Sequence, residues 1–539
     1  MTPTPSTGPV WGRTDWLFLL VVLGVSLSYE TRFIHHWLNV IDEGWPLYAA
    51  MQLHHGGVLY RDILFVFPPG HLLAAWIGYG WDPPGVVSAR VLYAGFNIAL
   101  CLCMYVLGRR VMPARWALLG ALILALAAPL SHRAQLLFGY RYLVFSVLAL
   151  LAFSQRLRSG DTRWMFVSGC LVGVAVCFRL TPAFAASVGI GIGVLAAASD
   201  WRRWLRDLTW FGCGGLLIAL PVIAWFASDV GLATLWREIV VRPVVMTELQ
   251  SLPVPALTVP TVFDRELIHD AFVALLFRVV AMLYLVYAVV LLARWRRCVI
   301  GKQRFDQALL LAIAVWGGIY FLRSLGRADE PHLSSAIPPF CLLAAHALHA
   351  GLERLYRLRP RLLRWRLQLS ALTASSALAL WVFLPGADQP FSAAYRGYTP
   401  FAPLHGDIRL NKVDWWHVLE AKIGAIRELA PAGSTILDLS AESLLYVISE
   451  RMGPGSSDII MPGTFLDSDE ERAFIARLEQ DPPSLVIVRA IAFDDMRSRA
   501  VGRTAPLLMD WIARRYAVTG DPEDYLMLTP RPVREFGTP

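Results

Sequence analysis

Two adjacent carboxylates, Asp42 and Glu43, lie in a polar stretch that follows the first long apolar run of the chain. A carboxylate held in a dry cavity can accept a proton from an attacking hydroxyl group, which is general base catalysis. Neighbouring residues of a helix project about 100° apart, so only one of the two acids can face a reacting centre. We assign a catalytic role to this pair, with Asp42 as the base and Glu43 orienting the loop or binding a metal ion or a basic partner.

Asp42 also has a purely structural interpretation. It is a good N-cap for a helix over about 43–55, which Gly56 would close. Capping does not exclude catalysis, so both interpretations stay open.

Charged side chains in two loops could bind a phosphate or a hydroxyl-rich ligand. Arg61 and Asp62 follow the acidic pair, whereas Arg327, Asp329 and His332 lie in a later polar loop. An arginine presents a fork of donors that matches phosphate oxygens. In the later loop, Asp329 could instead cap the next helix and Arg327 could merely pair with it.

Five further arginines lie inside apolar runs or near their ends. An arginine well inside a membrane span costs roughly 2.5 to 3.5 kcal/mol on insertion scales, so each needs an acid, a water-filled cavity or an anionic headgroup as partner. Snorkelling explains any one of them, but together they suggest an anion site at the outer leaflet. They are Arg90, Arg141, Arg179, Arg278 and Arg323.

No metal site is recognisable from residue spacing. The adjacent imidazoles of His35-His36 and His54-His55 rarely bind one ion, because helical ligand pairs stand three or four residues apart. The seven cysteines form neither a disulfide framework nor a zinc motif. Participation of a divalent metal ion therefore stays open.

The composition indicates what holds these residues in place. The chain has 539 residues, of which 56% are hydrophobic and only 17% are charged, which excludes a soluble globular, disordered or fibrous protein. The net charge of +8 is concentrated in short arginine-rich bursts between apolar runs, the pattern of cytoplasmic loops in membrane proteins. Nucleic acid is therefore not an expected partner.

Apolar runs near the ~20 residues of a membrane span recur up to residue 386. The candidates are 14–32, 64–80, 86–107, 116–130, 139–155, 164–180, 181–198, 208–227, 268–293, 307–323, 333–352 and 367–386.

The run at 64–80 decides the topology. It is short and broken by Pro68-Pro69-Gly70, so we expect it to lie at the membrane interface. All five arginine-rich bursts then face the cytoplasm, as the positive-inside rule requires. The sequence therefore predicts a polytopic all-α membrane protein with about eleven transmembrane helices, an N-terminus in the cytoplasm and everything after residue 386 outside.

Two domains are predicted: a transmembrane domain over residues 1–386 and a small extracytoplasmic α/β domain over 387–539. The second is more polar, and we interpret it as an accessory or docking domain. Its expected strands are 435–439, 485–488 and 525–528, and its expected helices are 415–430, 441–450, 468–480 and 506–516.

This arrangement resembles the GT-C superfamily of integral membrane glycosyltransferases, in particular the protein O-mannosyltransferase and aminoarabinose transferase branch. Members of that branch commonly carry a second acid after the third span, where this chain reads Ser131-His132-Arg133-Ala134-Gln135, which leaves metal use and the acceptor class open. The resemblance rests on the many-span body, the outer tail, Asp42-Glu43 after the first span, and the approach from Tyr60-Arg61-Asp62 to Pro68-Pro69-Gly70.

The resemblance implies a sugar donor linked to polyprenyl phosphate, membrane lipids as neighbours, a place in the inner membrane, and an envelope glycan, lipid or protein as acceptor. Asp42 would deprotonate the acceptor hydroxyl, which displaces the phosphate with inversion. Arg61 and Arg327 would stabilise the leaving phosphate. The sugar, a hexose or a pentose, is left open.

A transporter or lipid flippase that transfers no sugar is the alternative, and a scaffold in an envelope-building complex is a third possibility. The polar signals gather on one face of the membrane instead of recurring at mid-span in paired halves, which favours the enzyme.

Overall fold

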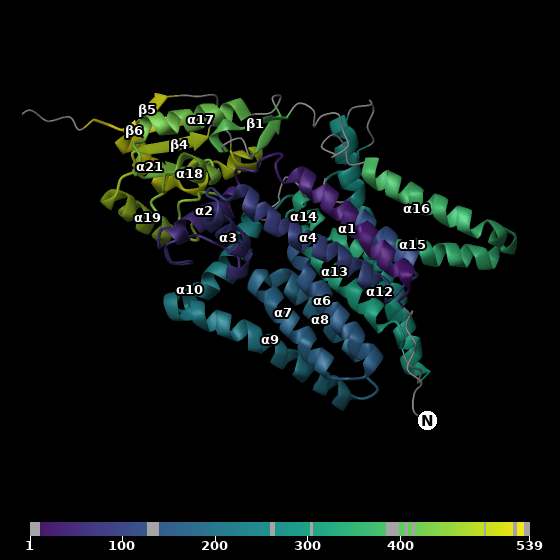
Figure 1. The fold of residues 1–539 in the computed structure, drawn as a ribbon. Coiled ribbons are helices and arrows are strands. Elements are labelled where there is room, and N and C mark those ends of the chain that lie inside the picture. Colours follow the sequence, from purple (N-terminus) through teal and green to yellow (C-terminus); the bar gives the residue numbers. More distant parts are fainter. Residues whose placement is uncertain are drawn as a thin grey trace, which may run out of the picture.

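The computed structural model of the chain describes residues 11–126, 140–258, 265–301, 305–383, 398–404, 408–411, 416–489, 492–520 and 525–532. Long helices form a bundle, and a small α/β domain, the tail domain (the described residues within 398–532), covers one end of it (Figure 1). The mainly helical membrane fold with a small C-terminal sheet, as expected from the sequence, is confirmed.

The long helices coincide with the apolar runs of the sequence. They are α1 (Arg13–Phe33), α4 (Val86–Gly108), α5 (Ala114–Ala125), α6 (Leu143–Ser159), α7 (Arg163–Phe178), α8 (Leu180–Ala197), α9 (Trp201–Val230), α12 (Arg265–Ile300), α13 (Ala308–Ser324), α15 (Ile337–Leu358) and α16 (Arg366–Phe383). Among the described residues, five helices are long and apolar enough to cross a membrane, namely α1, α4, α8, α9 and α12, and α5, α7 and α13 are shorter apolar helices.

The run at 64–80 forms no helix of span length. It gives a 3-10 turn, η1 (Pro69–Leu72), followed by the nine-residue helix α3 (Leu73–Trp81). Nine residues rise about 14 Å, less than half of the ~30 Å hydrocarbon core of a bilayer. Gly78 lets α3 pack closely on α4, because a Cβ atom there would lie 2.6 Å from the Ala89 nitrogen.

Small residues bring the bundle helices together backbone to backbone. α7 packs against α9, where a Cβ atom at Gly169 would lie 2.0 Å from the Phe211 carbonyl oxygen. α8 packs against α13, where a Cβ atom at Gly189 would lie 2.5 Å from the Ala312 carbonyl oxygen. Such close contacts are typical of helices that associate in lipid. Lipid tails are as apolar as the side chains, so burial of apolar side chains contributes little to the association, and close packing contributes more.

The tail domain is built on a four-stranded sheet in the order β3-β4-β6-β5. β3 and β4 are parallel, and the other two pairs are antiparallel. The predicted strands are confirmed, but β5 was missed because it follows a helix without any turn residue between them. The strands are β3 (Ile436–Asp438), β4 (Leu485–Arg489), β5 (Tyr516–Gly520) and β6 (Tyr525–Pro530).

Four helices of the tail domain follow the sequence-based expectation, although the helix expected over 441–450 begins only at Leu444, and the short helix α20 was not expected. The helices are α17 (Trp416–Leu429), α18 (Leu444–Ser449), α19 (Ser468–Gln480), α20 (Val501–Thr504) and α21 (Pro506–Arg515).

The tail domain is joined by main-chain hydrogen bonds to the loop that follows α1. A separate two-stranded sheet, β1 (Tyr398–Pro400) and β2 (Arg409–Asn411), meets this loop where the Trp37 amide donates to the Arg409 carbonyl over 3.1 Å. The loop carries α2 (Gly44–His54), and a Cβ atom at Gly44 would lie 2.2 Å from the Leu444 nitrogen of α18. α2 is therefore clamped between the bundle and the tail domain.

Candidate active site

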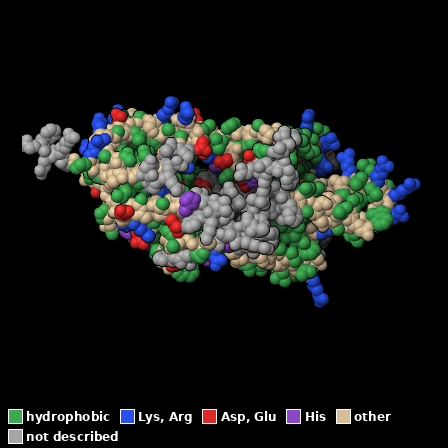
Figure 2. Space-filling view, turned by 90° about the horizontal axis from the view of Figure 1, so that it is seen from above, with side chains coloured by type: hydrophobic (Ala, Val, Ile, Leu, Met, Phe, Trp, Pro, Cys, Tyr) green, Lys and Arg blue, Asp and Glu red, His purple; other side chains and the backbone are tan. Residues whose placement is uncertain are grey.

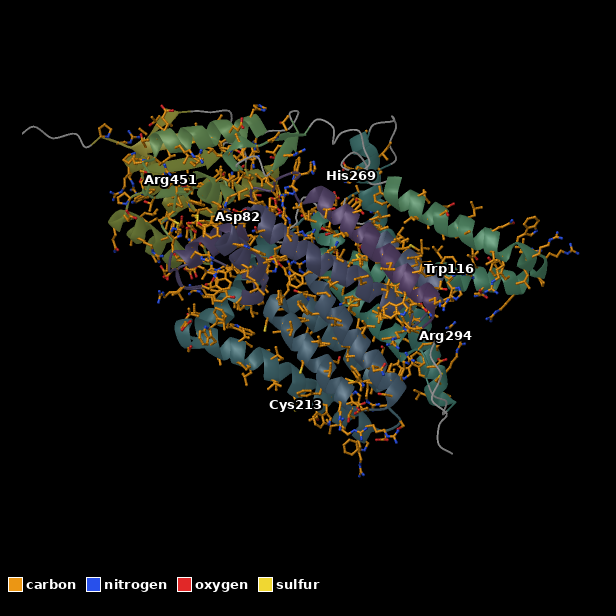
Figure 3. All side chains as sticks on the ribbon, in the orientation of Figure 1. Asp82, Trp116, Cys213, His269, Arg294 and Arg451 are labelled. Carbon is orange, nitrogen blue, oxygen red and sulfur yellow. The ribbon has the colours of Figure 1, made fainter. Side chains whose placement is uncertain are left out.

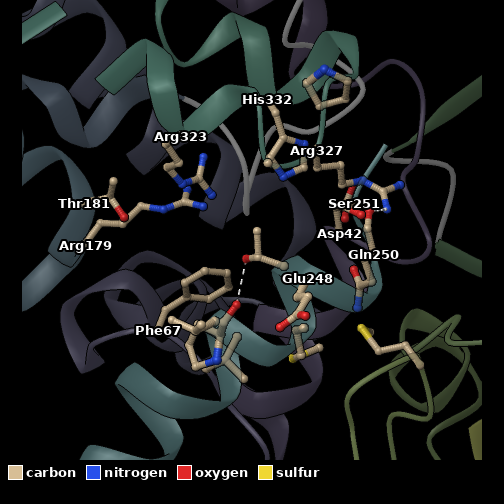
Figure 4. Close-up of a pocket in the computed structure, with 18 of the residues that line it drawn as sticks. Asp42, Phe67, Arg179, Thr181, Glu248, Gln250, Ser251, Arg323, Arg327 and His332 are labelled. Atoms are coloured by element: carbon tan, nitrogen blue, oxygen red, sulfur yellow. Dashed lines mark hydrogen bonds between the residues drawn. The ribbon is translucent and has the colours of Figure 1, made fainter. Parts of the chain in front are cut away.

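A cavity of about 610 Å³ lies between the segment that joins α1 to α3 and three later segments. These segments are the junction of α7 and α8, the stretch formed by η5 (Arg237–Val241) and α11 (Arg242–Leu249), and the loop that leads into α14 (Glu330–Ser334). Figure 4 shows Asp42 and Arg327 on one side of this cavity and Arg179 and Arg323 on the other.

Asp42 is held at the cavity wall by a side chain that the sequence analysis missed. The Asn39 amide donates to the Asp42 carboxylate over 2.8 Å, while the Asn39 carbonyl oxygen accepts the backbone N–H of Asp42 over 2.8 Å. Burial raises the pKa of Asp42 to about 7, a shift that the Asn39 hydrogen bond opposes. An asparagine three residues before an acid is the sequence signal for such a turn.

The capping interpretation of Asp42 is wrong. The residue at the N-cap of α2 is Glu43, which makes no capping hydrogen bond with its side chain. The expected helix itself is present, and Gly56 follows its end with a φ of 88°. The Asp42 carboxylate is therefore not used by the helix.

Glu43 points away from the cavity and into the bundle. Its carboxylate binds Arg90 of α4 through two hydrogen bonds of 2.8 and 2.5 Å. The exposed fractions of the two side chains are 1% and 0%. Of the roles expected for Glu43, the structure shows the basic partner and the orientation of the loop, and it keeps Glu43 out of contact with the cavity.

Arg327, Asp329 and His332 lie together on the cavity wall, as the sequence suggested. Arg327 binds Asp329 over 2.7 Å, and Asp329 caps α14 by accepting the His332 amide over 3.0 Å. The His332 ring nitrogen Nδ1 also lies 2.6 Å from Asp329. Burial lowers the pKa of His332 to about 4, although the Asp329 charge opposes the shift, so the ring is neutral at pH 7.

Arg179 and Arg323 supply positive charge to the opposite side of the cavity. Figure 4 shows their guanidinium groups close together. Arg179 lies over the Phe67 ring, 5.0 Å from its centroid, which fixes the direction of the side chain. Arg323 forms no ion pair with any residue that the structure describes. Two of the five arginines singled out from the sequence thus line the same cavity.

The other three of those arginines are occupied elsewhere. Arg90 pairs with Glu43, and Arg141 lies 3.9 Å from Glu30. Arg278 donates to the Pro255 carbonyl over 3.1 Å.

Arg61 and Asp62 do not line this cavity. They pair with each other over 2.8 Å, with side chains 60% and 40% exposed. Arg61 instead lines a smaller hollow against α19, together with Arg477. The loop turns toward the tail domain at this point, since the Ser456 amide donates to the Asp62 carbonyl. The short sequence distance from Asp42 to Arg61 did not reveal that turn.

The described residues gather no set of three or more His, Cys, Asp or Glu side chains that could hold a metal ion. Asp329 and His332 already bind each other and Arg327. The loop at 131–135, where the family's second acid was sought, lies outside the described residues. We therefore derive no step through a metal.

A second cavity, of about 360 Å³, adjoins the first and is completed by the tail domain. Asp42, Arg327 and Phe493 line both cavities. Asp42 thus stands at a junction of two spaces, which no feature of the sequence indicated.

Comparisons with known proteins agree with this architecture. The family model described as dolichyl-phosphate-mannose-protein mannosyltransferase matches residues 68–226. None of the curated proteins matches the chain.

Solved structures of two proteins are among those to which this chain is similar. ArnT from Cupriavidus metallidurans, bound to undecaprenyl phosphate, has 16% identity and a TM-score of 0.55 over 98% of this chain and 100% of that chain. The oligosaccharyltransferase AglB from Archaeoglobus fulgidus, in complex with an inhibitory peptide and a dolichol-phosphate, has 12% identity and a TM-score of 0.52 over 89% of this chain and 69% of that chain. The likeness inferred from the sequence is therefore confirmed at the level of the fold.

Proposed function

We propose that this chain, a membrane protein with the fold of the GT-C glycosyltransferases, transfers a sugar from a polyprenyl-phosphate-linked donor to an envelope acceptor, a glycan, lipid or protein. One observation carries the proposal. A carboxylate with a pKa near 7 and a pair of arginines lie on opposite sides of one cavity. This separation suits a reaction in which a hydroxyl group attacks from one side and a phosphate leaves on the other.

The arginine side of the cavity takes the phosphate. Arg179 and Arg323 are preorganised there, and fixed positive charge in a site that excludes water stabilises a leaving phosphate strongly. The walls nearby are apolar and suit a polyprenyl chain; they include Phe67, Ile239, Val244 and Met246. Arg61, which the sequence suggested for this role, is replaced by these two arginines in the proposal.

Asp42 acts as the general base. A carboxylate with a pKa near 7 is about half ionised at neutral pH and remains a stronger base than an ordinary aspartate. It takes the proton from the acceptor hydroxyl, whose oxygen forms a bond to the anomeric carbon. The bond between that carbon and the phosphate oxygen breaks, and the phosphate leaves with the electron pair. Attack opposite the leaving group inverts the anomeric centre.

Glu43 positions this base without touching the substrate. Its ion pair with Arg90 fixes the start of α2 against α4. Arg327 lies beside Asp42, and its ion pairs with Asp329 and Asp494 hold this part of the cavity wall in place.

We further propose about eleven membrane spans in the inner membrane, with the N-terminus in the cytoplasm and the tail domain outside. The shortness of α3 supports its exclusion from the spans. Arg294, from one of the basic bursts, lies away from the tail domain that holds Arg451 (Figure 3). Further arginines gather where α15 turns into α16, which projects from the body (Figure 2).

The test is a transfer assay with purified protein in lipid nanodiscs. A panel of polyprenyl-phosphate sugars, hexoses and pentoses, is labelled in the sugar and incubated with envelope extract. We expect label from one donor to move to an acceptor, and Asp42→Asn to lower the rate about 10² to 10⁴-fold while the protein still binds polyprenyl phosphate. If the label stays on every donor but crosses the bilayer, the protein is a flippase and not a glycosyltransferase.

A further inference from the structure

The second cavity occupies the position where α/β sheets bind ligands. Its walls include Ser440, just after β3, and Arg489 and Phe493, at and after the end of β4. β3 and β4 are parallel, so their carboxyl ends meet at one edge of the sheet. Ligands of open α/β sheets bind outside that edge. The edge of the sheet formed by the carboxyl ends of β3 and β4 therefore faces the cavity that Asp42 also lines.

The lining of the second cavity differs from that of the first. Polar atoms form the larger part of its exposed lining, whereas apolar atoms form most of the exposed lining of the first cavity. A polyprenyl chain fits the first cavity, and a polar, sugar-like molecule fits the second. The polar residues in question are Asn39, Asp42, Ser440, Asp495 and Thr504.

Three of the charged side chains that line the second cavity are paired with one another. Asp494 accepts from Arg327 over 2.6 and 2.8 Å and also binds Arg499. Arg499 donates in addition to the Ser251 carbonyl over 2.6 Å. These three side chains form a fixed wall that links the tail domain to the loop after α11.

Arg489 is different. It lines the cavity, yet its side chain forms no hydrogen bond or ion pair with any described residue. Its Nε atom is buried and lacks a hydrogen-bond partner. A buried donor without a partner is unfavourable, and an oxyanion of a bound molecule would satisfy it with a charge-assisted hydrogen bond.

We propose that the second cavity binds the acceptor, a carbohydrate that carries an anionic group near the reacting hydroxyl, and that Arg489 binds this anionic group. The inference rests on the proposed transfer and extends it, because it makes the tail domain one half of the active site instead of an accessory domain. Asp42, which lines both cavities, is then placed between the donor sugar and the acceptor hydroxyl.

The experiment separates acceptor binding from donor binding. Transfer is measured with labelled donor against increasing amounts of envelope extract, and binding of polyprenyl phosphate is measured separately. For Arg489→Gln we expect an apparent KM for the extract at least tenfold higher, with polyprenyl phosphate binding changed less than twofold. Arg489→Lys, which keeps the charge, should recover part of the loss.

Two further variants control for folding and for charge. Arg503→Gln removes an exposed arginine of α20 that lines neither cavity, and should transfer normally. Thr504→Trp narrows the second cavity without a change of charge and should raise the same KM. It replaces Arg489→Gln as the test if that variant fails to fold.

Treatment of the extract distinguishes the two sources of negative charge. Loss of transfer after phosphatase treatment assigns a phosphate, and loss after esterification assigns a carboxylate. Transfer that survives both treatments, label recovered in protein, or an unchanged KM for Arg489→Gln would overturn the inference. Failure of the native protein to transfer any sugar would instead overturn the proposed function on which it rests.

Discussion

The carboxylate of Glu43 and the guanidinium of Arg90 form a two-pronged ion pair that is closed to solvent, with 1% and 0% of the side chains exposed. The same arginine donates to the main-chain carbonyls of Ile34 and Trp37, each over 2.8 Å. Arg90 of α4 thus holds the backbone of the segment that leads from Ile34 to Asp42 in place.

Loss of that pair should destabilise the protein. Glu43→Gln leaves the Arg90 charge buried without its counter-ion, and breaking a buried pair in this way costs about 3 to 5 kcal/mol. We expect this loss in the free energy of unfolding, measured by denaturant titration in detergent. Asp62→Asn, which breaks the exposed pair with Arg61, is the matched control and should change it by less than about 1 kcal/mol. Equal effects of the two variants would contradict the positioning role.

The rate should depend on pH through Asp42. Burial raises its pKa to about 7, and the Asp329 and Glu43 charges add to the shift, whereas Asn39 and Arg327 oppose it. Because only the ionised carboxylate accepts a proton, kcat/KM should rise with pH up to about 7 and level off above it. Asn39→Ala removes the Asn39 hydrogen bond and should move the rise of kcat/KM to higher pH. If the rise stays at the same pH in this variant, Asp42 is not the base.

Binding of the lipid phosphate should depend on Arg323 and not on Arg61. Arg323 lines the main cavity, whereas Arg61 lies in a separate hollow and is mostly exposed. We expect Arg323→Gln to weaken polyprenyl phosphate binding at least tenfold, a loss of about 1.4 kcal/mol. Arg61→Gln removes the same charge from the first loop and should bind normally. If Arg61→Gln weakened polyprenyl phosphate binding and Arg323→Gln did not, Arg61 would be the residue that binds the phosphate.

Contact between α2 and the tail domain should be sensitive to a single methyl group. A Cβ atom at Gly44 would lie 2.2 Å from the Leu444 nitrogen, so Gly44→Ala forces α2 and α18 apart. Overpacking of this kind costs about 1 to 3 kcal/mol, and proteolysis should release the tail domain faster. Gly24→Ala on α1, where nothing lies within 4 Å of the added atom, is the control. Identical proteolysis of both variants would mean that this contact does not hold the domain.

The sequence predicts the individual helices and strands better than it predicts the tertiary contacts between them. The long helices follow from apolar runs. Arg179 and Arg323 were singled out because an arginine in an apolar run needs a partner, and Asp42 because it belongs to an acidic pair that could act as a general base. Arg61 was assigned to the phosphate because it is near Asp42 along the chain, but the loop turns away between them. Arg489 could not be found, because its significance depends on a cavity that forms only when the tail domain docks.

The hydrogen bonds between the segment around Trp37 and β2 join parts of the chain that leave the ribosome far apart in time. In the proposed topology the first loop reaches the outer surface early, whereas β2 and α18 are translocated only after the last long helix. Until then Asp42 lacks one wall of its surroundings. In that topology, the surroundings of Asp42 would be complete only after the last long helix has been inserted.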